Sequence, residues 1–88
     1  MTFHELLETM VQEDASDMFV TAKLPVSAKI NGELQAIAEG TLTPEQSLGL
    51  VHDAMNEKQR KQFDEEKECN FAISIDGIGR FRISAFWQ

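Results

Sequence analysis

The chain has 88 residues, of which 42% are hydrophobic and 26% are charged, proportions typical of a single small globular domain. Its 15 acidic residues outnumber the 8 basic residues and give a net charge of -7, which argues against nonspecific binding to nucleic acid. It has one cysteine, no apolar run long enough to cross a membrane and no signal peptide at its start, and these features together predict a soluble cytoplasmic protein.

The first predicted elements are a helix over residues 3–13 and a strand over residues 18–22. Thr2 and Glu5 have the spacing of a capping box, and apolar residues then recur at the helical interval. The predicted buried stripe of this helix consists of Phe3, Leu6, Leu7, Met10 and Val11. Turn-forming residues end the helix, and the run that follows them is rich in side chains that favour strands.

A β-hairpin is predicted next, with its turn at Asn31-Gly32. Both residue types tolerate the positive φ that a two-residue hairpin turn requires. The strand before the turn alternates the apolar residues Val26, Ala28 and Ile30. The strand after it has two alternative inward-facing sets, which are Leu34, Ala36 and Ala38, or the opposite parity with Ile37.

Two further helices are predicted in the middle of the chain. The first begins with Thr43 as N-cap, proline at the first helical position and Gln46 at the third. Its predicted buried stripe is Leu48, Val51, His52 and Met55. Asn56 caps the second helix, over residues 57–66, whose main apolar anchor is Phe63.

The stretch from Cys69 to Gln88 predicts a second hairpin, with its turn at Asp76-Gly77. Its inward-facing residues are Phe71, Ile73 and Ile75 before the turn, and Phe81, Ile83, Ala85 and Trp87 after it. The strand pattern runs to the final residue, Gln88, without a cap or a polar tail. We therefore expect the chain to be part of a longer protein.

The fold class follows from the order of these elements, which is α-β-β-β-α-α-β-β. Two hairpins joined by helical connections predict an α+β domain, in which helices pack against an antiparallel sheet of about five strands. Residues 1–88 are expected to form this single domain, without an internal linker or repeat.

Few residues have the spacing that catalysis or metal binding requires. His4 and His52 have no second ligand at a helical interval, so a surface role and a half-buried helical role are favoured, and no metal site is predicted. Cys69 lies beside Glu68, whose charge would raise the thiol pKa, so a buried structural residue is favoured over a nucleophile. The acidic run over residues 64–68 is interpreted as a solvated helix end.

Arg80 and Arg82 are the strongest candidates for a binding site. Both lie on the face of the last strand that is opposite to its apolar residues. The planar guanidinium binds two oxygens of a phosphate or a carboxylate at once. The alternative is a solvated strand face that pairs with the acidic helix. A phosphate role would need a second domain, because the chain contains neither a GxxxxGK(S/T) loop nor a GxGxxG motif.

The whole chain resembles the N-terminal domain of the type IV pilus retraction ATPases, the PilT/PilU family. The resemblance is carried by ELLETMVQEDASDMFVTAKLP, KINGEL, LTPEQ, MNEKQRKQF, ECNFAIS and GIGRFRISAFWQ. Many PilT members have a histidine two residues after the aspartate of the ASD motif, where this chain has Phe19. This difference, together with the sequence ECNF that starts at Glu68, makes the chain more similar to the PilU branch.

The resemblance implies a PAS-like domain that gates nucleotide and assembles the ring of a hexameric retraction motor. In the full-length protein it implies a following RecA-like ATPase domain, bound ATP and Mg²⁺, and phosphate contact by Arg82 with support from Arg80. The fragment alone, which lacks the Walker A loop, is expected to bind no cofactor and to be inactive. The implied partners are neighbouring subunits, a paralogous retraction ATPase and the platform protein at the cytoplasmic face of the inner membrane, at the pilus base.

Two alternative functions remain at this point. One is a stand-alone PAS-like sensor or interaction module, which would need a ligand pocket that no motif in the chain predicts. The other is the N-domain of a secretion or pilus-extension ATPase, although such proteins usually carry additional N-terminal domains and this chain starts at its first helix.

Overall fold

Residues 2–87 are described by the computed structural model, and they contain three helices and five strands in the predicted order. The elements are α1 (Phe3–Gln12), β1 (Asp17–Thr21), β2 (Ser27–Ile30), β3 (Glu33–Ala36), α2 (Pro44–His52), α3 (Glu57–Glu66), β4 (Glu68–Ile75) and β5 (Gly79–Phe86). The predicted α+β class is confirmed. Gln88, where the strand pattern was expected to end, lies outside the described residues, and β5 itself ends at Phe86.

Each helix begins at a capping box, which satisfies backbone N–H groups that have no partner within the helix. The N-cap side chains are those of Thr2, Thr43 and Asn56, and in each case the N-cap backbone N–H donates a hydrogen bond to the side-chain oxygen of the third helical residue. The start of all three helices was therefore predicted correctly from local signals. α3 then ends at Lys67, which adopts the left-handed conformation at φ 64° and lets the chain enter β4 directly.

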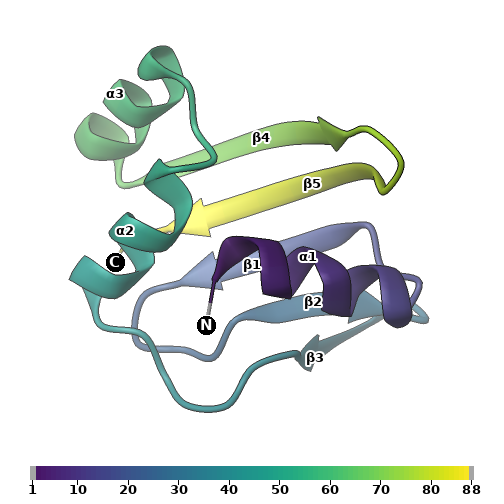
Figure 1. Ribbon diagram of the computed structural model, residues 1–88. Helices are drawn as coiled ribbons and strands as arrows, with labels where there is room; N and C mark the ends of the chain where they lie inside the picture. The colour runs from purple at the N-terminus through teal and green to yellow at the C-terminus, as the bar shows by residue number, and fades with distance from the viewer. Residues whose placement is uncertain (1, 88) are drawn as a thin grey trace.

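The sheet is mixed, with the strand order β3-β2-β1-β5-β4. Both hairpins are antiparallel as predicted, but β1 and β5 run parallel in the centre of the sheet, so the expectation of a wholly antiparallel sheet was wrong in this detail. The helices carry the chain from the β3 edge to the opposite edge, where β4 begins. β5 then returns between β4 and β1, and this placement makes it parallel to β1 (Figure 1).

The helices pack against one face of the sheet and enclose the core (Figure 1). The alternation predicted for the C-terminal hairpin is confirmed, because its inward residues are buried or half-buried and Arg80 and Arg82 are exposed on the other face. Phe63 anchors α3 as predicted and is fully buried. The core includes Leu6, Leu7, Met10, Met18, Val20, Val26, Ala28, Val51, Phe63, Phe81, Ile83 and Ala85.

The predicted core differs from the structure in α1 and α2. Val11 is 49% exposed, because it lies at the edge of the α1 stripe rather than within it. In α2 the buried residues are Ser47 and Val51, whereas Leu48 and His52 are half-buried and Met55 is buried after the helix has ended. Ser47 is accommodated in the core because its hydroxyl donates a hydrogen bond to the Pro44 carbonyl, at 2.9 Å.

The edge strand β3 is exposed along its whole length, so neither of its two alternative faces is buried within the strand. Leu34 is 64% exposed and pairs with Lys29 across the hairpin, while Ala36 pairs with Ser27. Ile37 and Ala38 follow the strand and are half-buried. An edge strand that lies beyond the helical layer has no buried face. The alternation of apolar residues in its sequence therefore cannot predict which side chains are buried.

Candidate functional site

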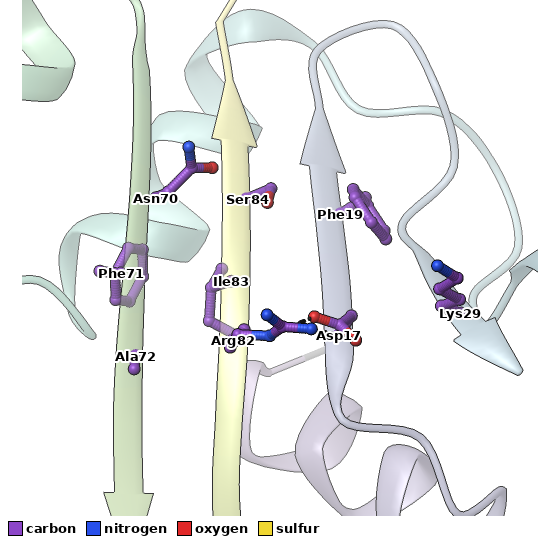
Figure 2. Close-up of a pocket in the computed structure, with 9 residues that line it drawn as sticks. All are labelled: Asp17, Phe19, Lys29, Asn70, Phe71, Ala72, Arg82, Ile83 and Ser84. Atoms are coloured by element: carbon purple, nitrogen blue, oxygen red, sulfur yellow. Dashed lines mark hydrogen bonds and ion pairs between the residues drawn. The ribbon is translucent and has the colours of Figure 1, made fainter. Parts of the chain in front are cut away.

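A depression of about 590 Å³ lies on the face of the sheet opposite the helices (Figure 2). Four adjacent strands contribute to it, with Lys29 from β2, Asp17 from β1, Arg82 from β5 and Asn70 from β4. These side chains share a face because each is offset by one position from the buried residues of its strand. The depression is therefore a product of the same alternation that builds the core on the other face.

The guanidinium of Arg82 reaches across to β1 and meets the carboxylate of Asp17 at two points (Figure 2). Arg82 Nε is 2.7 Å from Asp17 Oδ1, and Arg82 Nη2 donates to Asp17 Oδ2 at 3.2 Å. The two groups thus form a bidentate ion pair on one edge of the guanidinium, which we call the fork. The Arg82 side chain is 74% exposed and the Asp17 side chain is 20% exposed, so the arginine is accessible from solvent while it is paired.

The parallel pairing of β1 with β5 creates this contact. In that register Asp17 stands beside Arg82, and the next outward pair is Phe19 with Ser84. The Arg82 backbone N–H also donates to the Ser16 carbonyl at 2.8 Å, which ties the start of β1 to the middle of β5. The two charged side chains are consequently mounted on strands that are hydrogen-bonded to each other.

The ion pair contributes little to stability, because exposed pairs are typically worth about 0.2–1 kcal/mol. Its main physical effect is to restrict the rotamers of a long side chain that would otherwise be mobile in water. The alternative expectation, that the arginines pair with the acidic helix, is wrong for Arg82, whose partner lies on β1. Arg82 itself faces outward as predicted.

Asp17 and Lys29 are members of the site that sequence reasoning missed. The β1–β2 pairing of Met18 with Ala28, extended by one residue, places Lys29 opposite Asp17, so the aspartate has a cation on each neighbouring strand. Within residues 2–87 the ion pairs include neither Lys29 nor Arg80. The depression therefore carries one carboxylate and two cationic side chains, although the chain as a whole has a net charge of -7.

Arg80 lies outside the depression that contains Arg82. It is exposed on the same face of β5, two residues earlier, which corresponds to about 7 Å along a strand. It lines a separate surface hollow with Val11, Asp14 and Ile78. The structure thus brings Arg82 together with Asp17 and Lys29, and it leaves Arg80 at the margin of that group.

The two histidines occupy the places that their spacing favoured. His4 is exposed on α1 and contacts Glu8, with 2.8 Å between Nε2 and Oε1. His52 is half-buried at the junction of α2 and α3, where its Nε2 lies 3.1 Å from Asp64 Oδ1. In the part of the chain that the structure describes, no three potential ligands come together in the way a metal ion requires.

Cys69 is buried at the start of β4, as expected for a structural residue. Its pKa is raised, first by burial of the thiol and second by the charge of Glu66. The expected direction was correct, but burial is the main cause and the carboxylate belongs to Glu66 rather than Glu68. The thiol also donates a weak hydrogen bond to Gln62 Oε1, at 3.6 Å.

We expect Cys69 to react with iodoacetamide at pH 8 at least about tenfold more slowly in the folded protein than in urea, because both the thiolate population and access are reduced. A thiol with a higher pKa in the folded state disfavours the thiolate there. The protonated thiol therefore contributes its full stabilisation to the folded state below the unfolded-state pKa of about 8.5. This stabilisation is lost as the pH rises through the pKa of the thiol in the folded state. Equal alkylation rates in the two states, followed by mass spectrometry, would contradict the burial argument.

No protein-family model matches the chain. Among curated proteins, the chain is 51% identical over 88 residues to the type IV pilus ATPase PilU of Pseudomonas aeruginosa, and 38% identical to the type IV pilus retraction ATPase PilT of that organism. Both matches cover 100% of this chain but only 23% and 26% of the relatives. A twitching motility protein of Neisseria gonorrhoeae is 26% identical over 81 residues, which is 92% of this chain and 22% of that protein.

A solved structure gives the same result for the fold. The crystal structure of the pilus retraction motor PilT with bound ADP superposes on this chain with a TM-score of 0.78 and 30% sequence identity. The match covers 100% of this chain and 26% of the PilT chain. The α+β fold and these whole-chain matches make the chain similar to one domain of the type IV pilus ATPases. Within that class its similarity is to the PilT/PilU family, and the matches are consistent with the N-terminal domain of that family. Identities of 51% to PilU and 38% to PilT confirm the predicted similarity to the PilU branch.

The chain spans about a quarter of the length of these relatives. Its described residues contain no helix with the length and apolar character needed to cross a bilayer.

Proposed function

We propose that this chain is the nucleotide-gating and ring-assembly domain of a hexameric type IV pilus retraction ATPase. The proposal is supported by whole-chain similarity to proteins named as type IV pilus ATPases and as a pilus retraction motor. The observation that carries it is Arg82, an exposed guanidinium held by one edge on a rigid strand, with its other edge open to a ligand. A stand-alone sensor is less well supported, because the relatives named as ATPases are about four times as long as this chain.

In this proposal the full-length protein continues into a RecA-like domain with a Walker A loop, which would hold most of the nucleotide and its Mg²⁺. The bound nucleotide supplies the phosphate group whose transfer to water drives the motor. Arg82 would contribute a positive charge at the phosphates when the two domains close. A guanidinium in that place stabilises the negative charge of phosphoryl transfer and makes hydrolysis depend on the relative position of the domains.

The other cations have secondary roles in this proposal. Lys29 lies in the same depression as Arg82 and adds positive charge that favours an anionic ligand there. Arg80 would support nucleotide binding from the separate hollow that it lines beside the end of α1. Neither residue has the fork that fixes Arg82, so both are expected to contribute less to turnover.

The proposed setting is the cytoplasmic face of the inner membrane at the pilus base. Partners there would be neighbouring subunits of the ring, a paralogous retraction ATPase and the inner-membrane platform protein. The proposed output is disassembly of the pilus and twitching motility. These assignments rest on the similarity to PilU and PilT.

The test begins with the native reading frame beyond Gln88. We expect a strand, a GxxxxGK(S/T) loop and a helix within about 100 residues, because such a loop and helix N-terminus are needed to bind a triphosphate. The full-length protein should then release phosphate from ATP, and the isolated chain of residues 1–88 should not. A stop codon near Gln88, or a full-length protein without ATPase activity, would overturn the proposal.

A further inference from the structure

Asp17 is the fixed member of the ion pair on the open face of the sheet. Its side chain is only 20% exposed, and the Ser16 hydroxyl donates a hydrogen bond to Asp17 Oδ2 at 3.4 Å. It begins β1, where the Ser16 carbonyl accepts from the Arg82 backbone at 2.8 Å. The carboxylate therefore has a defined position relative to β5, whereas the exposed guanidinium depends on the carboxylate for its own position.

The fork leaves half of the guanidinium available. Asp17 accepts from Nε and from one hydrogen of Nη2, so Nη1 and the second hydrogen of Nη2 are left over. Those remaining donors form the second edge of the planar group, which can bind two phosphate oxygens while the first edge stays on the carboxylate. One arginine can thus be oriented from one side and bind a ligand on the other.

We infer that Asp17 is a positioning residue that orients Arg82 and presents its free edge to the phosphate. The inference rests on the proposed function and adds a residue to it. An arginine without this partner would sample many rotamers, and a small displacement of a charged group at a reacting phosphate strongly reduces its effect. Asp17 also has Lys29 opposite it on β2, so its negative charge lies between the two cations and offsets their mutual repulsion.

The test is Asp17→Asn in the full-length protein, assayed for kcat and KM of ATP hydrolysis. Asparagine keeps the shape but loses the charge that holds the fork, so kcat/KM should fall about tenfold. The melting temperature should fall by less than about 8 °C, because the lost ion pair is exposed. Asp17→Glu should recover part of the loss, since it restores the carboxylate. Asp53→Asn is the matched control, because Asp53 is exposed at the end of α2, on the side of the helices, and its change should leave turnover unaltered.

A double-mutant cycle separates positioning from an independent effect. If Asp17 acts through Arg82, then Asp17→Asn should cause no further loss in an Arg82→Ala background. Three results would overturn the inference and leave the proposed function standing. They are additive losses in the double variant, normal turnover in Asp17→Asn while Arg82→Ala is impaired, and faster turnover in Asp17→Asn. Unchanged turnover in Arg82→Ala itself would remove the proposed function and the role of Asp17 with it.

Discussion

Replacing Arg82 with alanine in the full-length protein is expected to lower ATP turnover by about 100-fold or more. Removing a single donor that stabilises developing charge in an active site typically costs about 100-fold to 1,000-fold in kcat. Arg82 is suited to that role because it is exposed, rigidly mounted on β5 and paired through one edge only. The measurement is steady-state release of inorganic phosphate at saturating ATP, compared with the unmodified protein.

The fold should survive this substitution. The lost ion pair is exposed and worth about 1 kcal/mol or less, which corresponds to a fall of less than about 8 °C in the melting temperature of a domain of this size. Calorimetry of residues 1–88 carrying Arg82→Ala would measure that shift directly. A larger fall would mean that lost activity reflects unfolding, and the variant could then not be used to assign a role.

Two further variants make the Arg82 result specific. Arg82→Lys keeps the positive charge but loses the planar fork, so most of the activity should still be lost if two-oxygen contact matters. Arg80→Ala removes an equivalent charge from the same face of β5, outside the depression, and should reduce turnover only a few-fold. Wild-type turnover in Arg82→Ala would contradict a phosphate-contacting role for this residue.

The local signals in the sequence predicted the elements of this fold well. Capping boxes at Thr2, Thr43 and Asn56 each start a helix where expected, because an N-cap and its third helical residue satisfy each other's backbone within one turn. The Asn31-Gly32 turn formed for the same local reason, as both residues adopt positive φ. These interactions join residues that are only a few positions apart, so a short stretch of sequence is enough to predict them.

The pairing of β1 with β5 could not be predicted in the same way. Its partners are 65 residues apart in the case of Asp17 and Arg82, and no local motif links them. What aligns the two strands is burial, because the register places Met18 beside Ile83 and Val20 beside Ala85 under the helices. Once that inner register is fixed, the outward residues Asp17 and Arg82 must be neighbours. Alternation therefore predicted that Arg82 faces outward but could not identify what it meets.

Phe63→Ala is expected to cause the largest loss of stability, about 3–5 kcal/mol. Phe63 is the buried residue of α3, with 0% of its surface exposed, and every other side chain of that helix is at least partly in water. Its ring packs against Trp87, with 6.3 Å between ring centroids, and against the edge of His52. A small domain has a total stability of about 5–15 kcal/mol, so this single truncation would remove a large part of it.

The measurement is urea unfolding of residues 1–88, followed by the fluorescence of Trp87, the single tryptophan of the chain. Trp87 contacts both the Phe63 ring and the Lys67 ammonium, which is 4.0 Å from the centroid of the indole. Loss of the phenyl ring should let water reach the indole and shift its emission to longer wavelength even before unfolding. Phe63→Leu keeps most of the volume and should cost less than about 1.5 kcal/mol, while the exposed Glu65→Ala should change stability by less than about 0.5 kcal/mol.

These variants distinguish a loss of packing from a loss of helix propensity. Alanine favours helix more than phenylalanine does, so a destabilised Phe63→Ala domain cannot be attributed to the backbone of α3. If the substitution cost less than about 1 kcal/mol and left the Trp87 emission unchanged, α3 would not be held to the sheet by this contact. Because α3 leads directly into β4, which pairs with the strand that carries Arg82, its docking supports the strand on which the proposed phosphate contact is mounted.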